Sequence, residues 1–282
     1  MAYEPSARFE VKVFDVEIPR QGSPLLGRIY QPQGPGPFPM LLDEHGGAWS
    51  NGDRFNDEWV DQPLSESGLL ILSPEFRIGP NDPFPGQLQD IDLATRWFKA
   101  HARELNGDAT TLGGIGFSSG GHTVVLSAMR PRHPVYSALP LAEAEHEDAS
   151  LQYVISCWPV IDPLARYERA KAKDNQELVE KHDRFFLTID AQIDANPVRI
   201  LERKEQVELP PVLLCHGTAD DSVPYEWVTR FAQLYREAGG DASVEAFEGA
   251  PHGFGRRPEY KERLFSVTRA FIERRVGARV AV

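Results

Sequence analysis

The stretch GIGFSSGGH, residues 114–122, places Ser118 in a Gly-x-Ser-x-Gly pentapeptide. The apolar run before it, TLGGIGF (111–117), is typical of a buried strand, and the run after it, GGHTVVLSAM (120–129), is typical of a helix. Such a pentapeptide alone occurs by chance in about a tenth of chains of this length. Between a strand and a helix, it predicts a tight turn that exposes the serine hydroxyl above the edge of a sheet.

The residues around Ser118 have separate expected roles. Side chains at Gly116 and Gly120 would collide where the helix and the strand approach each other, so glycine is needed at both positions. Ser119 does not satisfy the pattern, because Phe117 stands two residues before it. Its backbone N–H is instead placed to help hold an oxyanion. The alternative interpretation is that one of the two serines is an ordinary helix N-cap.

The chain as a whole alternates short apolar runs with longer helical patterns, which predicts a mostly parallel sheet covered by helices on both faces. Helices are indicated by apolar residues at spacings of three or four, as at Tyr260, Leu264, Val267 and Phe271 near the end of the chain. About eight strands are expected, in FEVKVFDVEI (9–18), LLGRIYQ (25–31), MLLDE (40–44), LLILSPEF (69–76), TLGGIGF (111–117), LQYVISCWPV (151–160), PPVLLCHG (210–217) and SVEAFEG (243–249).

One charge-rich stretch interrupts this rhythm. It lies between two expected strands and includes YERAKAKDNQELVEKHDRFF. We interpret residues 162–205 as a small helical cap inserted into a core formed by residues 1–161 and 206–282.

Composition limits the partners and the location of the protein. With 282 residues, of which 41% are hydrophobic, the chain suffices for one large core. Its formal net charge of -12 argues against nucleic acid or an anionic membrane as a partner. No uncharged apolar run reaches the roughly 18 residues of a membrane span. The opening MAYEPSARFEVKVFD has no signal-peptide pattern, and Cys157 and Cys215 lie in expected core strands, so we predict a cytoplasmic protein.

A serine becomes a good nucleophile only when a base takes its proton, so a histidine and an orienting acid are expected. Among the eight histidines, His252 stands in GAPHGFG (249–255), between the last strand and the last helix, where it can reach the serine. His122 and His216 are expected to be buried and hydrogen-bonded. Four more are expected in solvated helices or loops, namely His101, His182, His133 and His146.

The acid is expected in HGTADDSVP (216–224), immediately after a strand. Asp220 is favoured on motif register, and Asp221 is the rival, which could instead cap the following helix. The order Ser118, Asp220, His252, with each residue at the carboxyl end of an expected strand, is typical of one fold.

Taken in order, these motifs resemble the α/β-hydrolase superfamily, and within it the carboxylesterases related to hormone-sensitive lipase and to the feruloyl and acetyl-xylan esterase-like group. The resemblance also includes HGGAW (45–49) and FRIGPNDPFPGQLQDI (76–91). It implies that Gly46 and Gly47, with Ser119, supply the oxyanion-hole N–H groups. Ala48 stands where lipase-like esterases usually have a third glycine, and this short form is also found in kynurenine formamidases.

The resemblance and the residues together predict a serine carboxylesterase that acts on short-chain or aryl esters, with Ser118 as nucleophile, His252 as general base and Asp220 orienting the imidazole. The small ester is the only partner required, and we expect no metal and no cofactor. An arylformamidase is the alternative. A less favoured one is a catalytically silent ligand-binding protein on the same fold.

An apolar substrate pocket is expected from the aromatic residues that neighbour the catalytic turns, Trp49, Phe117, Trp158 and Phe254. The cap could add Tyr167, Phe185 or Phe186, and core packing is the alternative for each of these rings. Two acids at the end of an apolar strand, Asp43 and Glu44, are expected to pair with a neighbouring arginine such as Arg77. The alternative is that they make the mouth of the pocket unfavourable for anionic substrates. The apolar tail VGARVAV (276–282) could pair with a second subunit to form a homodimer.

Overall fold

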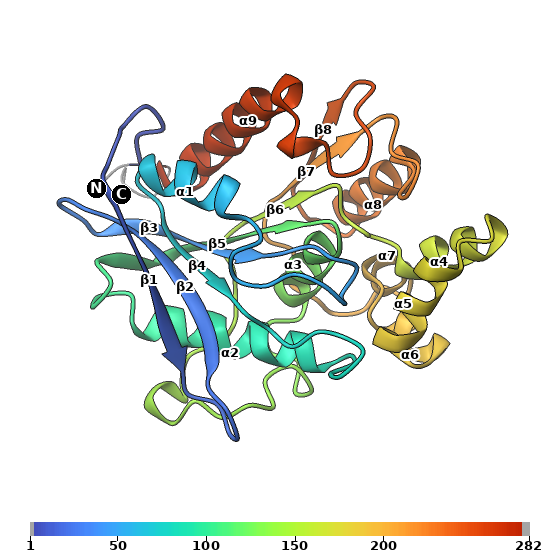
Figure 1. The fold of residues 1–282 in the computed structure, drawn as a ribbon, viewed down its shortest axis with the longest axis horizontal. Helices are drawn as coiled ribbons and strands as arrows, with labels where there is room; N and C mark the ends of the chain where they lie inside the picture. Colours follow the sequence, from blue (N-terminus) through green and yellow to red (C-terminus); the bar gives the residue numbers. More distant parts are fainter. Residues whose placement is uncertain (1–2, 278–282) are drawn as a thin grey trace.

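The computed structural model describes residues 3–277, which form one eight-stranded sheet in the order β1-β2-β4-β3-β5-β6-β7-β8 (Figure 1). The pairs β1–β2 and β2–β4 are antiparallel, and all other neighbours are parallel. The expected mostly parallel sheet is therefore confirmed. The strands are β1 (Val11–Ile18), β2 (Leu25–Pro32), β3 (Phe38–Glu44), β4 (Leu70–Pro74), β5 (Gly107–Phe117), β6 (Val154–Cys157), β7 (Val212–Gly217) and β8 (Ala242–Phe247).

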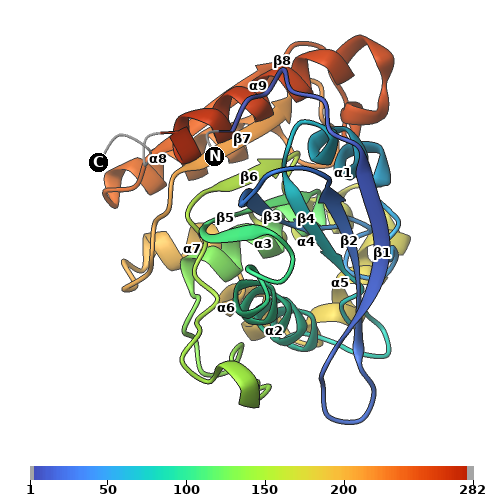
Figure 2. The same cartoon turned by 90° about the vertical axis from the view of Figure 1, so that its left-hand side faces the viewer.

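Helices cover both faces of the sheet, and Figure 2 shows strands running between α9 and α2. Because successive side chains of a strand point to opposite faces, Leu41 and Leu42 enter different cores. Leu42 packs with residues of α2 (Gly86–Ala100), α3 (Ser119–Met129) and α8 (Tyr225–Glu237). Leu41 packs with residues of α1 (Glu58–Glu66) and α9 (Pro258–Gly277). Two short 3-10 helices are η1 (Ala142–Ala144) and η2 (Phe254–Arg256).

Two elements differ from the sequence-based expectation. Helix α1 was not expected, because its short segment holds Pro63 and several acids; it nevertheless buries Val60 and Leu64. Strand β6 is shorter than the expected run over residues 151–160. It ends because Trp158 turns the chain with a φ of 39°.

The stretch between β6 and β7 forms four helices beside the core (Figure 1). Each begins with a side chain that accepts a backbone N–H bond, for example Asp162 from Ala165 at 2.9 Å. A second bond, from the Asn196 side chain to Asp162 at 2.7 Å, joins the start of the last of these helices to the start of the first. The helices are α4 (Pro163–Ala172), α5 (Gln176–Phe186), α6 (Ile189–Asp194) and α7 (Pro197–Glu202).

Three further expectations concern location and assembly. No helix within residues 3–277 combines the length and hydropathy that a membrane crossing requires. Cys157 and Cys215 are free and buried, opposite each other on β6 and β7. The proposed dimer tail (276–282) lies outside the described residues from position 278 onward.

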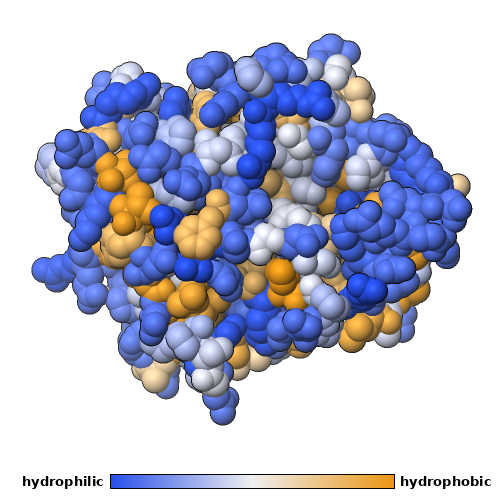
Figure 3. All heavy atoms as spheres, viewed as in Figure 1, coloured by the Kyte–Doolittle hydropathy of each residue, from blue (hydrophilic) through white to orange (hydrophobic). Residues whose placement is uncertain are grey.

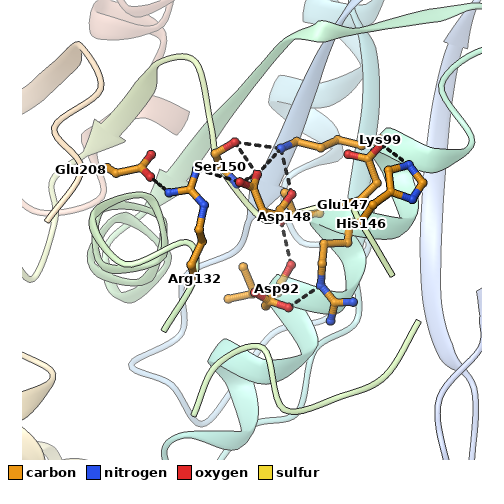
Figure 4. Close-up of polar contacts among 11 residues, drawn as sticks. Asp92, Lys99, Arg132, His146, Glu147, Asp148, Ser150 and Glu208 are labelled. Carbon is orange, nitrogen blue, oxygen red and sulfur yellow. Dashed lines mark hydrogen bonds and ion pairs between the residues drawn. The ribbon is translucent and has the colours of Figure 1, made fainter. Parts of the chain in front are cut away.

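An ion-pair network ties the segment between α3 and β6 to helix α2 (Figure 4). Asp148 accepts hydrogen bonds from Lys99 at 3.1 Å and from the Ser150 hydroxyl at 2.6 Å, and its other oxygen pairs with Arg132 at 2.8 Å. Arg132 also pairs with Glu208. Partial burial acts to raise the pKa of Asp148, but the bonds from Ser150 and Lys99 outweigh it and hold this pKa below its ordinary value.

This network predicts a pH-dependent loss of stability in Asp148→Asn. At pH 7 the free energy of unfolding of the variant should be about 1 to 2 kcal/mol lower than that of wild type, because charge-assisted hydrogen bonds at a partly exposed site are lost. A carboxylate whose pKa is lower in the folded chain stabilises it above its unfolded pKa, and this stabilisation is lost as the pH falls. The gap between wild type and variant should therefore narrow below about pH 4.

Urea unfolding at pH 7 and pH 3 measures this gap. Glu145→Gln is the matched control, because Glu145 is an exposed acid on the same segment. A gap of equal size at both pH values would contradict the assignment of the stabilisation to the Asp148 carboxylate.

Candidate active site

Ser118 stands on the tight turn between β5 and α3, with a φ of 55° and a ψ of -112°. A positive φ is strained for a residue with a side chain, so the surroundings must hold it in place. The Ser118 N–H donates to the Cys157 carbonyl at 2.9 Å, and the Ser118 carbonyl accepts from Val160 at 3.0 Å and His122 at 3.2 Å. The neighbouring strand β6 and the first turn of α3 thereby fix the serine backbone.

The expected steric need for glycine around Ser118 is confirmed. A Cβ on Gly120 would lie 1.8 Å from the carbonyl oxygen of Glu44, and one on Gly116 would lie 2.3 Å from the carbonyl oxygen of Gly120. Both distances are far inside van der Waals contact, and both obstacles are backbone atoms. Helix α3 can therefore start directly above the end of β3 only because these two side chains are absent.

The structure brings the three residues expected for catalysis together. The Ser118 hydroxyl lies 2.8 Å from Nε2 of His252, and Nδ1 of His252 lies 2.7 Å from a carboxylate oxygen of Asp220. The other Asp220 oxygen accepts backbone N–H bonds from Ser222 at 2.9 Å and Val223 at 2.8 Å. The backbone of the loop after β7 therefore orients the Asp220 carboxylate, and this carboxylate orients the His252 imidazole.

Asp220 and its rival Asp221 point to different surroundings. Burial acts to raise the pKa of Asp220, but the hydrogen bond and charge of His252 outweigh it, so the pKa lies below its ordinary value and the group is a carboxylate. The side chain of Asp221 is 82% exposed and pairs with Arg169 of helix α4 and with Lys173, the C-cap of that helix. The motif register that favours Asp220 agrees with this geometry.

The buried, hydrogen-bonded roles expected for two other histidines are found. His216 lies 2.8 Å from the Val223 carbonyl and 3.4 Å from Asp220, behind the carboxylate. His122 accepts the indole N–H of Trp49 at 3.2 Å and lies 2.6 Å from the Ala195 carbonyl. Burial lowers the pKa of His122 to about 4, so it is neutral near pH 7.

The surface position expected for His182 is wrong. This histidine is fully buried, with its ring centroid 5.0 Å from that of Trp49. Burial, followed by the charge of Arg166, lowers its pKa to about 3. The charged residues of α5 suggested a solvated helix, but the helix is amphipathic and its apolar face, with Phe185 and Phe186, packs on the core.

The glycine turn after β3 touches the serine turn. A Cβ on Gly46 would lie 2.8 Å from the Phe117 carbonyl oxygen and 3.3 Å from Cβ of Ser118. Ser119 ties the two turns together, because its hydroxyl accepts the Trp49 N–H at 3.2 Å. In the part of the chain that the structure describes, the N–H groups of Gly46 and Gly47 donate to no protein acceptor. They are thus available to bind an oxyanion.

The expected aromatic pocket is not found. Trp49 is 1% exposed and stacks on Phe185 at a centroid distance of 5.4 Å. Phe117, Trp158 and Phe254 are also buried and form one packed cluster, with centroid distances of 5.4 and 4.8 Å. Adjacency in sequence does not decide on which side of a turn a ring lies, and these four rings are directed into the core. These rings are therefore part of the core packing, which was the alternative expectation for them.

The cavity beside His252 is instead built largely from charged and small residues. Its volume is about 350 Å³, and one wall is helix α4. The sequence did not predict these residues, because most of them belong to the charge-rich stretch 162–205, where charge alone does not distinguish a pocket wall from a solvated face. The lining includes Arg166, Arg169, Lys173, Leu178, Ala219, Asp221, Ser222 and Pro251.

The expectation that Asp43 and Glu44 pair with Arg77 is also wrong. Arg77 pairs with Asp90 at 2.9 Å, at the start of α2. Asp43 and Glu44 point into opposite cores and accept bonds from Ser73 and Ser127 at 3.1 and 3.5 Å. Burial raises the pKa of Glu44 to about 8.

The class of the protein follows from this arrangement. A strained serine turn after β5, an acid after β7 and a histidine after β8, on a sheet of this order, define an α/β-hydrolase. The family comparison agrees, since the BD-FAE family model matches residues 28–234. The chain belongs to the BD-FAE family, and the α/β-hydrolase family expected from its motifs is confirmed.

Named relatives and a solved structure support this assignment. The chain is 29% identical to Esterase LipC of Mycobacterium tuberculosis over 77% of its own length and 53% of LipC. It is 30% identical to Esterase LipI of the same organism over 87% of its length and 75% of LipI. It thus spans only about half of LipC. The carboxylesterase EstE1, cloned from a metagenomic library, shares the fold with a TM-score of 0.79, at 20% identity and with 96% and 91% of the two chains covered.

The serine turn yields a stability prediction. Gly120→Ala should lower the free energy of unfolding by at least about 2 kcal/mol, because the new methyl group meets a backbone carbonyl that cannot rotate away. Gly277→Ala is the matched control, since no atom of residues 3–277 lies within 4 Å of its added Cβ, and it should change stability by less than about 0.5 kcal/mol. Chemical denaturation measures both. Equal stability of the two variants would contradict the close approach of α3 to β3.

Proposed function

We propose that the protein is a serine carboxylesterase that hydrolyses short-chain or aryl carboxylic esters through an acyl-enzyme intermediate. The observation that carries this proposal is the continuous path from the Ser118 hydroxyl through His252 to Asp220, with contacts of 2.8 and 2.7 Å. The names of LipC and LipI as esterases support it.

The geometry suits a two-step acyl transfer. Oγ of Ser118 attacks the ester carbonyl while Nε2 of His252 takes its proton, and Asp220 stabilises the resulting imidazolium. The histidine then gives the proton to the departing alkoxide, which leaves as the alcohol. A water molecule, activated in the same way by His252, then attacks the acyl-enzyme, and the carboxylic acid is released from Ser118. This scheme uses side chains and backbone N–H groups of the protein alone.

The developing oxyanion is assigned to the N–H groups of Gly46, Gly47 and Ser119. The first two lie on the turn that contacts the serine turn, and Ser119 is the first residue of helix α3. Donors fixed before the reaction need no reorganisation when charge develops, and one such donor is worth about 2.7 to 4 kcal/mol of barrier lowering.

Residues 162–205 act as the cap of the site in this proposal, on a core of residues 1–161 and 206–282. Helix α4 forms one wall of the cavity beside His252. A cavity of about 350 Å³ suits a small substrate and leaves little room for a long acyl chain. The homodimer and the cytoplasmic location remain predictions from the sequence.

The proposal predicts a serine-dependent preference for short esters. Wild type should cleave p-nitrophenyl butyrate faster than the palmitate ester, and Ser118→Ala should lose at least about 10,000-fold in kcat/KM for the butyrate. Ser137→Ala, an exposed serine far along the chain from the turn, is the matched control and should stay within twofold of wild type.

Initial rates on the ester series, with N-formylkynurenine in the same panel, make this test. A faster reaction of the formamide would make the protein an arylformamidase. Undiminished ester turnover in Ser118→Ala would refute the serine mechanism, and a failure of wild type on every substrate would favour a silent binding protein.

A further inference from the structure

The cavity beside His252 carries an excess of positive charge, although the whole chain has a net charge of -12. Arg166, Arg169 and Lys173 line it, together with one carboxylate, that of Asp221. Arg169 and Lys173 are paired with this carboxylate at 3.1 and 2.5 Å. The third cation, Arg166, is therefore the one without a paired carboxylate in this cavity.

Arg166 is buried without an ionic partner. Its side chain extends from α4 over the Trp49 ring at 5.8 Å, and only 5% of the residue is exposed. Its Nε donates a long bond of 3.3 Å to the Ser222 hydroxyl, and its Nη1 has no acceptor. Across residues 3–277, no aspartate or glutamate lies within ion-pair distance of this guanidinium. Burial lowers the pKa of Arg166 to about 10, which leaves it charged near pH 7.

Nearby acids cannot satisfy this charge. Asp220 is the carboxylate whose charge acts on Arg166, but its oxygens already accept from His252 and from two backbone N–H groups. The neighbours His122 and His182 are held neutral and offer no negative charge. Burial of a charge without a counter-charge is unfavourable, so a site that retains such a charge is suited to an anionic partner.

We propose that Arg166 binds a carboxylate of the substrate, so that the preferred ester carries an anionic group within a few bonds of the scissile carbonyl. The planar guanidinium matches a carboxylate with parallel N–H donors, and it lines the same cavity as His252. Arg169 and Lys173 at the outer wall draw the anion toward it. This inference rests on the proposed esterase function and names its substrate class.

Isosteric ester pairs test the inference. Monoethyl succinate, glutarate and adipate carry the carboxylate on the acyl side, and the corresponding ethyl succinamate, glutaramate and adipamate are neutral. In a further pair, 3-acetoxybenzoate carries the carboxylate on the alcohol side of the ester, and 3-acetoxybenzamide is its neutral partner. The readout is the ratio of kcat/KM for the charged ester to that for its neutral partner, measured in a pH-stat.

Wild type should favour the charged member of at least one pair by about tenfold or more, as expected for a buried ionic contact. Arg166→Met should reduce this ratio at least tenfold, and Arg166→Lys should restore part of it. Lys171→Met is the matched control, because it removes a cation from the same helix outside the cavity, and it should keep the ratio within twofold.

A second measurement covers the case that Arg166→Met does not fold. In wild type, glutarate should inhibit hydrolysis of a neutral ester competitively, and glutaramide should inhibit it at least tenfold more weakly. Serine-dependent hydrolysis with equal rates for the two members of every pair would overturn the role of Arg166 and leave the esterase proposal intact. Absence of turnover on all esters would overturn the esterase proposal itself.

Discussion

The close approach of helix α3 to the end of strand β3 is the constraint on which the rest of the site depends. A Cβ at Gly120 would lie 1.8 Å from the Glu44 carbonyl oxygen, so only glycine lets the helix begin there. This contact holds Ser118 at a φ of 55° and keeps its hydroxyl above the sheet. It also brings the turn at Gly46 against the serine.

The sheet supplies the other groups because parallel strands end at one edge. The loops after β7 and β8 start from neighbouring strands, which places Asp220 within 2.7 Å of His252 although 32 residues separate them. Residues 162–205 lie on one side of the site, with a hydrophilic outer surface (Figure 3) and an inner face of packed aromatic rings. Arg166 lies between these rings and the cavity, where its charge bears on substrate choice.

Local motifs made the strand pattern and the three central residues predictable. The serine turn and the register of HGTADDSVP depend on steric and hydrogen-bond rules that act within a few residues. The insertion was less predictable, because its charges suggested solvated helices while His182 and Arg166 are buried against Trp49. Whether a ring such as Phe117 lines a pocket or fills the core depends on packing between distant elements, which adjacency in sequence does not specify.

Covalent labelling by a p-nitrophenyl phosphonate tests the central claim, that the turn, His252 and Asp220 together activate Ser118. One adduct per chain is expected, located on Ser118 by peptide mass mapping, with p-nitrophenolate released in equal amount. Asp220→Asn should slow this labelling at least about 1,000-fold, and Asp221→Asn should stay within about fivefold of wild type. An adduct on another residue, or equal slowing in the two variants, would contradict the activation of Ser118 by His252 and Asp220.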